Sequence, residues 1–69
     1  MAKSFAKLIL KNFSTNTLLV TEAVNRLIFD IAYAEYALQS FNPAGETQES
    51  IDEAKQLLQK LKNLQESHK

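Results

Sequence analysis

The fold is decided by residues 17–41, TLLVTEAVNRLIFDIAYAEYALQSF, a stretch that contains neither glycine nor proline. Its best-spaced apolar residues follow one another in alternating steps of four and three: Val20, Val24, Leu27, Ile31, Ala34, Leu38 and Phe41. This spacing keeps them on one side of an α-helix, where they form a seam for neighbouring helices. At 1.5 Å per residue, the stretch predicts a central rod of about 37 Å.

The side of this central helix that faces away from the seam is apolar as well. Its large side chains are Leu18, Phe29, Tyr33 and Tyr36, with Ile28 at the edge of the seam. A helix that is apolar on two sides needs two sets of neighbours. We therefore expect the second face to pack against the first helix or against another copy of the chain. A chain of 69 residues without cysteine seldom buries enough apolar surface alone, which favours self-association.

The first helix is predicted over residues 2–13, with an apolar side and a basic side. The apolar side consists of Phe5, Ala6, Leu8, Ile9, Leu10 and Phe13, and the basic side of Lys3, Lys7 and Lys11. Such a helix packs against a neighbour or lies on an anionic membrane surface. The cap-forming residues 14–17 either separate it from the central helix or mark a kink in one continuous helix.

The last helix is predicted over residues 48–65, antiparallel to the central one. Residues 42–45 hold the single proline and the single glycine of the chain, which end the central helix and let the backbone reverse. The last helix is expected to start near Thr47 or Ser50, and Ser50 and Glu53 fit a capping box there. One apolar stripe follows: Ile51, Ala54, Leu57, Leu58, Leu61 and Leu64. The predicted fold class is all-α, a short N-terminal helix and a long antiparallel helical hairpin, in an oligomeric helix bundle.

The composition argues against several classes of function. A formal net charge of zero provides no bulk attraction for nucleic acid or for an anionic membrane. With no cysteine and a single histidine, His68, we expect no metal site, no cofactor and no catalytic Ser–His–Asp set. No apolar run approaches the roughly 20 residues of a membrane span, and residues 1–13 lack the pattern of a signal peptide. We expect a cytoplasmic protein that is not an enzyme.

Residues 41–45, Phe-Asn-Pro-Ala-Gly, and residues 51–55, Ile-Asp-Glu-Ala-Lys, carry a resemblance to a known family. They resemble the Phe-Asn-Pro-Ser-Gly loop and the Val-Asp-x-Ile-Lys helix start of some phage helical-hairpin proteins, the anti-CBASS sponges. Those proteins oligomerise and sequester cyclic oligonucleotide signals. The resemblance covers about fifteen residues, and here the loop follows the central helix rather than opening the hairpin. It implies phage anti-defence by sequestration of a small molecule at a subunit interface.

Three functions follow as hypotheses. The first is a non-enzymatic helical oligomer that acts as a protein-interaction or inhibitor module, with itself and another protein as partners. The second is a binder of an anionic, planar, nucleotide-like ligand that stacks on tyrosines while a lysine meets its phosphate. The third is a peripheral membrane protein that uses residues 2–13. The candidate ligand or interface residues are Lys7, Lys11, Phe29, Tyr33 and Tyr36.

Overall fold

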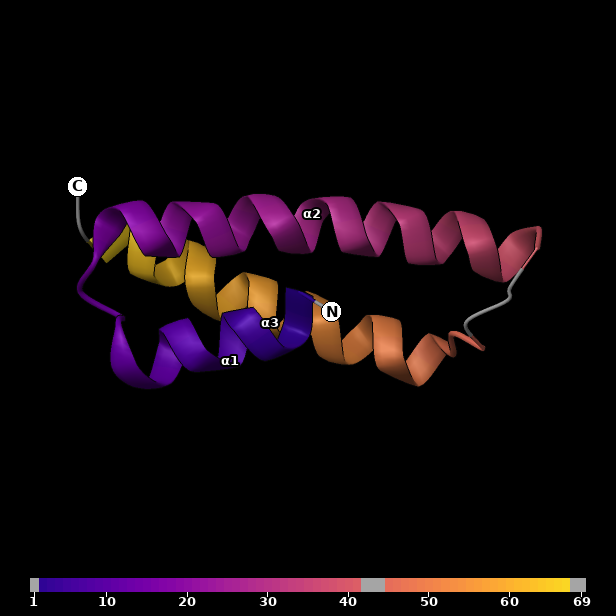
Figure 1. Cartoon of the computed structure of the whole chain (residues 1–69), viewed down its shortest axis with the longest axis horizontal. Helices are drawn as coiled ribbons and strands as arrows, with labels where there is room; N and C mark the ends of the chain where they lie inside the picture. Colours follow the sequence, from indigo (N-terminus) through magenta and orange to yellow (C-terminus); the bar gives the residue numbers. More distant parts are fainter. Residues whose placement is uncertain (1, 42–44, 68–69) are drawn as a thin grey trace.

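The computed structural model describes residues 2–41 and 45–67, and over these residues it consists of three α-helices and no strand (Figure 1). Helix α1 spans Ala2–Asn12, α2 spans Thr17–Gln39 and α3 spans Gln48–Ser67. The all-α prediction is therefore confirmed for the described part of the chain. The predicted turn residues 42–44, together with Met1, His68 and Lys69, lie outside the described residues.

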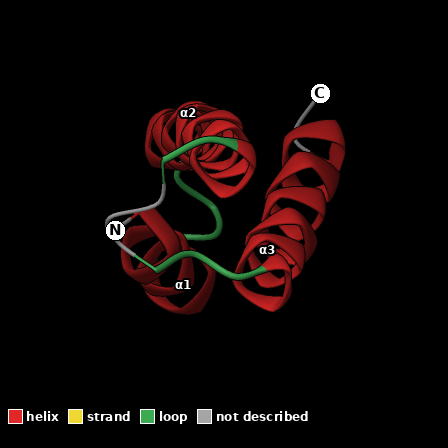
Figure 2. Ribbon diagram, turned by 90° about the vertical axis from the view of Figure 1, so that its right-hand side faces the viewer, coloured by secondary structure: helices red, strands yellow, loops and turns green. Residues whose placement is uncertain are grey.

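Helix α2 runs along nearly the whole length of the molecule, which measures 38 × 18 × 17 Å. Figure 1 shows α3 returning alongside α2 from its C-terminal end, while α1 lies beside the N-terminal half of α2. Seen end-on in Figure 2, α1 and α3 both lie on the same side of α2. One long side of α2 is therefore left without a neighbouring helix.

The core is formed by the seam of α2 and by the apolar sides of the two other helices. Its buried residues are Ala6, Ile9, Val20, Ala23, Val24, Leu27, Ile31, Ala34, Ile51, Ala54, Leu57 and Leu61. Among the described residues, no polar or charged side chain is buried. Because α1 contributes Ala6 and Ile9 to this core, the centre of its apolar side is unavailable to a membrane surface. No helix in the described part of the chain is long and apolar enough to cross a membrane.

The predicted seam is wrong at its C-terminal end. Leu38 is 37% exposed and Phe41 is 78% exposed, whereas Ala37 is buried instead. Helix α1 is too short to cover this half of α2, so only α3 packs there. Phe41 also lies beyond the last helical residue, Gln39, and so no longer follows the helical spacing.

The helix starts are set by side-chain caps. Asn16 has extended backbone geometry, and its Oδ1 accepts a hydrogen bond from the Leu19 N–H at 3.1 Å. Residues 13–16 are not helical, so α1 and α2 are separate helices and not one kinked helix. Of the two starts predicted for α3, the structure has Thr47, so the capping box at Ser50 is wrong. The cap is Thr47, whose Oγ1 accepts from the Ser50 N–H at 3.1 Å, while Ser50 lies inside the helix.

Polar contacts between described residues help to hold α1 on the other two helices. A helix of eleven residues is marginal in isolation, so it depends on such tertiary contacts and on its buried side chains. These contacts include the Ala2 N–H to Asp30 Oδ2 at 3.0 Å, Lys3 Nζ to Ser50 Oγ at 2.6 Å, and Lys7 Nζ to Glu53 Oε1 at 3.0 Å.

Candidate interaction surface on the outer side of α2

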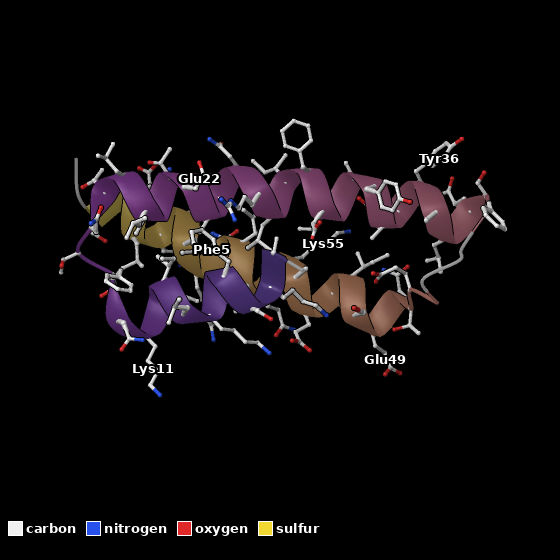
Figure 3. All side chains as sticks on the ribbon, in the orientation of Figure 1. Phe5, Lys11, Glu22, Tyr36, Glu49 and Lys55 are labelled. Carbon is white, nitrogen blue, oxygen red and sulfur yellow. The ribbon has the colours of Figure 1, made fainter. Side chains whose placement is uncertain are left out.

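The side of α2 that faces away from α1 and α3 carries a row of exposed residues, which we call the outer stripe. It consists of Leu18, Glu22, Asn25, Phe29, Tyr33, Tyr36 and Ser40. Its four large apolar or aromatic members, Leu18, Phe29, Tyr33 and Tyr36, are between 64% and 84% exposed. Figure 3 shows the labelled Tyr36 pointing away from the other helices.

The outer stripe is exposed because none of its residues belongs to the buried core of the three helices. Residues three and four apart share one side of a helix, so the seam and the stripe occupy opposite sides of α2. Both partner helices pack on the seam side. Of the two neighbours expected for the second face, the first helix is therefore excluded, since Tyr33 and Tyr36 remain mostly open to solvent.

Charged residues line the two edges of the outer stripe and are paired within the chain. On the side of α1, Arg26 Nε contacts Glu22 Oε1 at 2.9 Å, and the guanidinium lies 4.4 Å from the centre of the Phe5 ring. On the side of α3, Lys55 Nζ contacts Glu35 Oε2 at 3.3 Å. Glu22 is thus the one charged member of the outer stripe, and the other charged residues of these two ion pairs lie along its edges.

A shallow hollow of about 430 Å³ lies where the start of α1 meets α2. It is lined by Ala2, Phe5, Arg26, Phe29 and Asp30. Its two charged side chains already bond within the chain: Asp30 accepts from the Ala2 N–H, and Arg26 pairs with Glu22. The hollow thus presents the side chains of Phe5 and Phe29 together with charged groups that are already paired.

The structure brings together three of the five predicted site residues and separates the two lysines from them. Phe29, Tyr33 and Tyr36 share the outer stripe. Lys7 instead bonds to Glu53 on α3, and this hydrogen bond and the positive charge lower the pKa of the Glu53 carboxyl. Lys11 points away from the body of the molecule on the side opposite Tyr36 (Figure 3). The tyrosines therefore have neither lysine beside them.

Two features of this surface were not predicted: the stacking of Arg26 on Phe5 and the bond from Ala2 to Asp30. Both join α1 to α2 across more than twenty residues of sequence, so no local spacing signals them. In the part of the chain that the structure describes, no group of three histidine, cysteine, aspartate or glutamate residues could hold a metal ion.

No protein-family model, curated protein or solved structure matches this chain. Its function has to be inferred from the outer stripe and the residues around it.

Proposed function

We propose that this chain is a non-enzymatic interaction protein that works as an oligomer and associates through the outer stripe of α2. In this proposal the antiparallel hairpin of α2 and α3, braced by α1, serves as a rigid support for the stripe. The observation that carries the proposal is the high exposure of Phe29, Tyr33 and Tyr36 on a regular helix whose opposite side already packs a complete core.

The size and composition of the stripe suit a protein interface. An aromatic side chain carries about 150–250 Å² of surface, so the exposed parts of Phe29, Tyr33 and Tyr36 amount to roughly 400 Å². That is about half of the ~800 Å² that each partner contributes to a standard interface. Leu18 and Ile28 enlarge the patch. Aromatic residues surrounded by a polar rim are also the usual composition of interface hot spots.

The two alternative functions have less support. A nucleotide-like ligand stacked on the tyrosines needs a cation nearby, but Lys7 bonds to Glu53 and Lys11 lies on the opposite side of the molecule. Arg26 is closer to the stripe, but its charge is paired with Glu22. A membrane-surface role for α1 needs its apolar side, and Ile9 at the centre of that side is buried in the core.

Sedimentation equilibrium of the purified chain, from low micromolar to millimolar concentration, tests the proposal. We expect a mass that rises above that of one chain as the concentration increases. Tyr36→Glu should weaken this association at least tenfold, because it places a charge in the interface. Gln56→Glu, the same change of charge on the exposed side of α3, should leave it unchanged. A wild-type chain that stays monomeric at millimolar concentration would overturn the proposal.

A further inference from the structure

We infer that the partner on the outer stripe is a second copy of this chain, whose α2 runs antiparallel across a two-fold axis at Phe29. This inference rests on the proposed function and adds the arrangement of the two copies. It assigns a contact to each half of the stripe. The tyrosines of one copy meet the polar residues Glu22 and Asn25 of the other.

The spacing of the outer stripe is the same in both directions from Phe29. From Leu18 to Phe29 the steps are four, three and four residues, and from Phe29 to Ser40 they are again four, three and four. Eleven residues in three turns keep such a row on one side of a nearly straight helix. A reversed copy of the row therefore meets the original position by position, which is the requirement for a two-fold symmetric interface.

This antiparallel register brings together complementary side chains. Phe29 meets Phe29 of the second copy at the centre, where aromatic rings stack favourably. Tyr36 meets Glu22, and the tyrosine hydroxyl can donate to the carboxylate. Glu22 Oε1 already accepts from Arg26, which leaves Oε2 as the acceptor. Tyr33 meets the amide of Asn25 in the same way, and symmetry repeats both pairs.

A parallel arrangement of the two helices lacks this complementarity. It would place Glu22 against Glu22 and bring like charges together inside the interface, which disfavours association. It would also align the two helix dipoles side by side, whereas antiparallel helices oppose them. The charges and the helix dipoles thus both favour the antiparallel direction.

The structure leaves room for a second α2 along the whole stripe. Helices α1 and α3 both lie behind α2 as seen from the outer stripe, so neither blocks the approach (Figure 2). Packed helices have axes about 8–10 Å apart. At that distance Ile28 and Ala32, exposed along the edge of the stripe on the side of α3, extend the contact.

The absence of cysteine from the sequence makes disulfide trapping a direct test of this arrangement. Leu18→Cys and Ser40→Cys chains of different mass are mixed and oxidised under conditions in which sedimentation has measured the wild-type association. A disulfide needs Cα atoms about 4.4–6.8 Å apart, so only facing positions react efficiently. We expect disulfides mainly between the two different chains, and few within either chain type alone. Gln56→Cys, on α3, serves as the background control.

The outcomes separate the inference from the proposed function. If the wild type associates but Leu18→Cys links mainly to itself, the copies are parallel and the inference fails while the proposed function stands. If the wild type associates but disulfides between positions 18 and 40 form no more often than the Gln56→Cys background, the proposed register is wrong. The inference then fails, while the proposed function stands. If the wild type does not associate at all, both the proposed function and the inference fail.

A double-mutant cycle tests the Glu22–Tyr36 pair separately. Tyr36→Phe and Glu22→Gln should each raise the dissociation constant of the dimer by about threefold to tenfold. The dissociation constant of the double variant should be no higher than that of the more weakly associating single variant, because each change removes the same hydrogen bond. Effects that multiply fully in the double variant would show that the two residues do not meet.

Discussion

The backbone N–H of Ala2, at the start of α1, donates to Oδ2 of Asp30 in the middle of α2 at 3.0 Å. The first N–H groups of a helix have no partner within the helix, and its N-terminus favours a negative charge. Helix α1 has no acidic residue in its own first turn. Asp30 therefore caps α1 from a different helix, and links the start of the chain to the centre of α2.

Removing this cap should destabilise the chain. We expect Asp30→Ala to lower the free energy of unfolding by about 1 kcal/mol, the usual cost of losing a capping side chain. Asp30→Asn keeps an acceptor oxygen but loses the charge, so its cost should be smaller. Urea unfolding followed by circular dichroism measures both at a concentration where the chain is monomeric. An Asp30→Ala variant as stable as the wild type would contradict the role of the cap.

The features that were predicted correctly from the sequence depend on local spacing. The seam from Val20 to Ala34, a cap among residues 14–17 and the second apolar side around Phe29 all follow from helical periodicity and cap chemistry within one segment. The features that were missed depend on the length and position of other helices. Leu38 is exposed because α1 reaches along α2 only as far as Asp30. The partners of Asp30 and Arg26 on α1, Ala2 and Phe5, lie more than twenty residues away in the sequence.

Thr47 and Ser50 both carry a hydroxyl near the start of α3, but we expect only the loss of the Thr47 hydroxyl to uncap the helix. Thr47 Oγ1 accepts from the Ser50 N–H, whereas the Ser50 hydroxyl accepts from Lys3 Nζ. Thr47→Ala should therefore cost about 1 kcal/mol of stability, and it should cause the first turn of α3 to fray. Amide hydrogen exchange at Ser50 measures the fraying. Ser50→Ala leaves the cap intact and should not increase that exchange, and fraying caused by Ser50→Ala instead would argue for the capping box.

Gly45 has a backbone φ of +67°, in the left-handed region that favours glycine. A Cβ atom at this position would meet nothing within 4 Å, so a larger residue is opposed by backbone strain alone. We expect Gly45→Ala to destabilise the chain by about 1 kcal/mol, and Gly45→Asn by less, because asparagine tolerates this conformation better. Thermal unfolding of the two variants measures the difference. Equal stability of alanine and glycine here would contradict the assigned conformation.

The ion pair between Lys7 and Glu53 predicts a pH dependence. The hydrogen bond and the charge of Lys7, with the charge of Lys3, lower the pKa of Glu53 below its usual value near 4.5. The stability contributed by the pair is complete above that unfolded-state pKa, and is lost as the pH falls through the lower pKa of the folded chain. A carboxyl ¹³C titration should show the pKa of Glu53 rising in Lys7→Gln, and Lys60→Gln serves as the control. A Glu53 pKa that Lys7→Gln leaves unchanged would contradict the pairing.

Leu27 and Phe29 are two residues apart on α2 and should respond in opposite ways to truncation. Leu27 is fully buried in the seam, so Leu27→Ala should cost about 2–5 kcal/mol at any protein concentration. Phe29 is 79% exposed, so Phe29→Ala should change the stability of the isolated chain by less than about 0.5 kcal/mol.

Self-association makes the melting temperature rise with protein concentration. This increase of the melting temperature with concentration should persist in a milder core variant, Leu27→Val. It should disappear in Phe29→Ala, because only Phe29→Ala removes the centre of the outer stripe. A Phe29→Ala chain that keeps the full concentration dependence would show that the copies meet elsewhere.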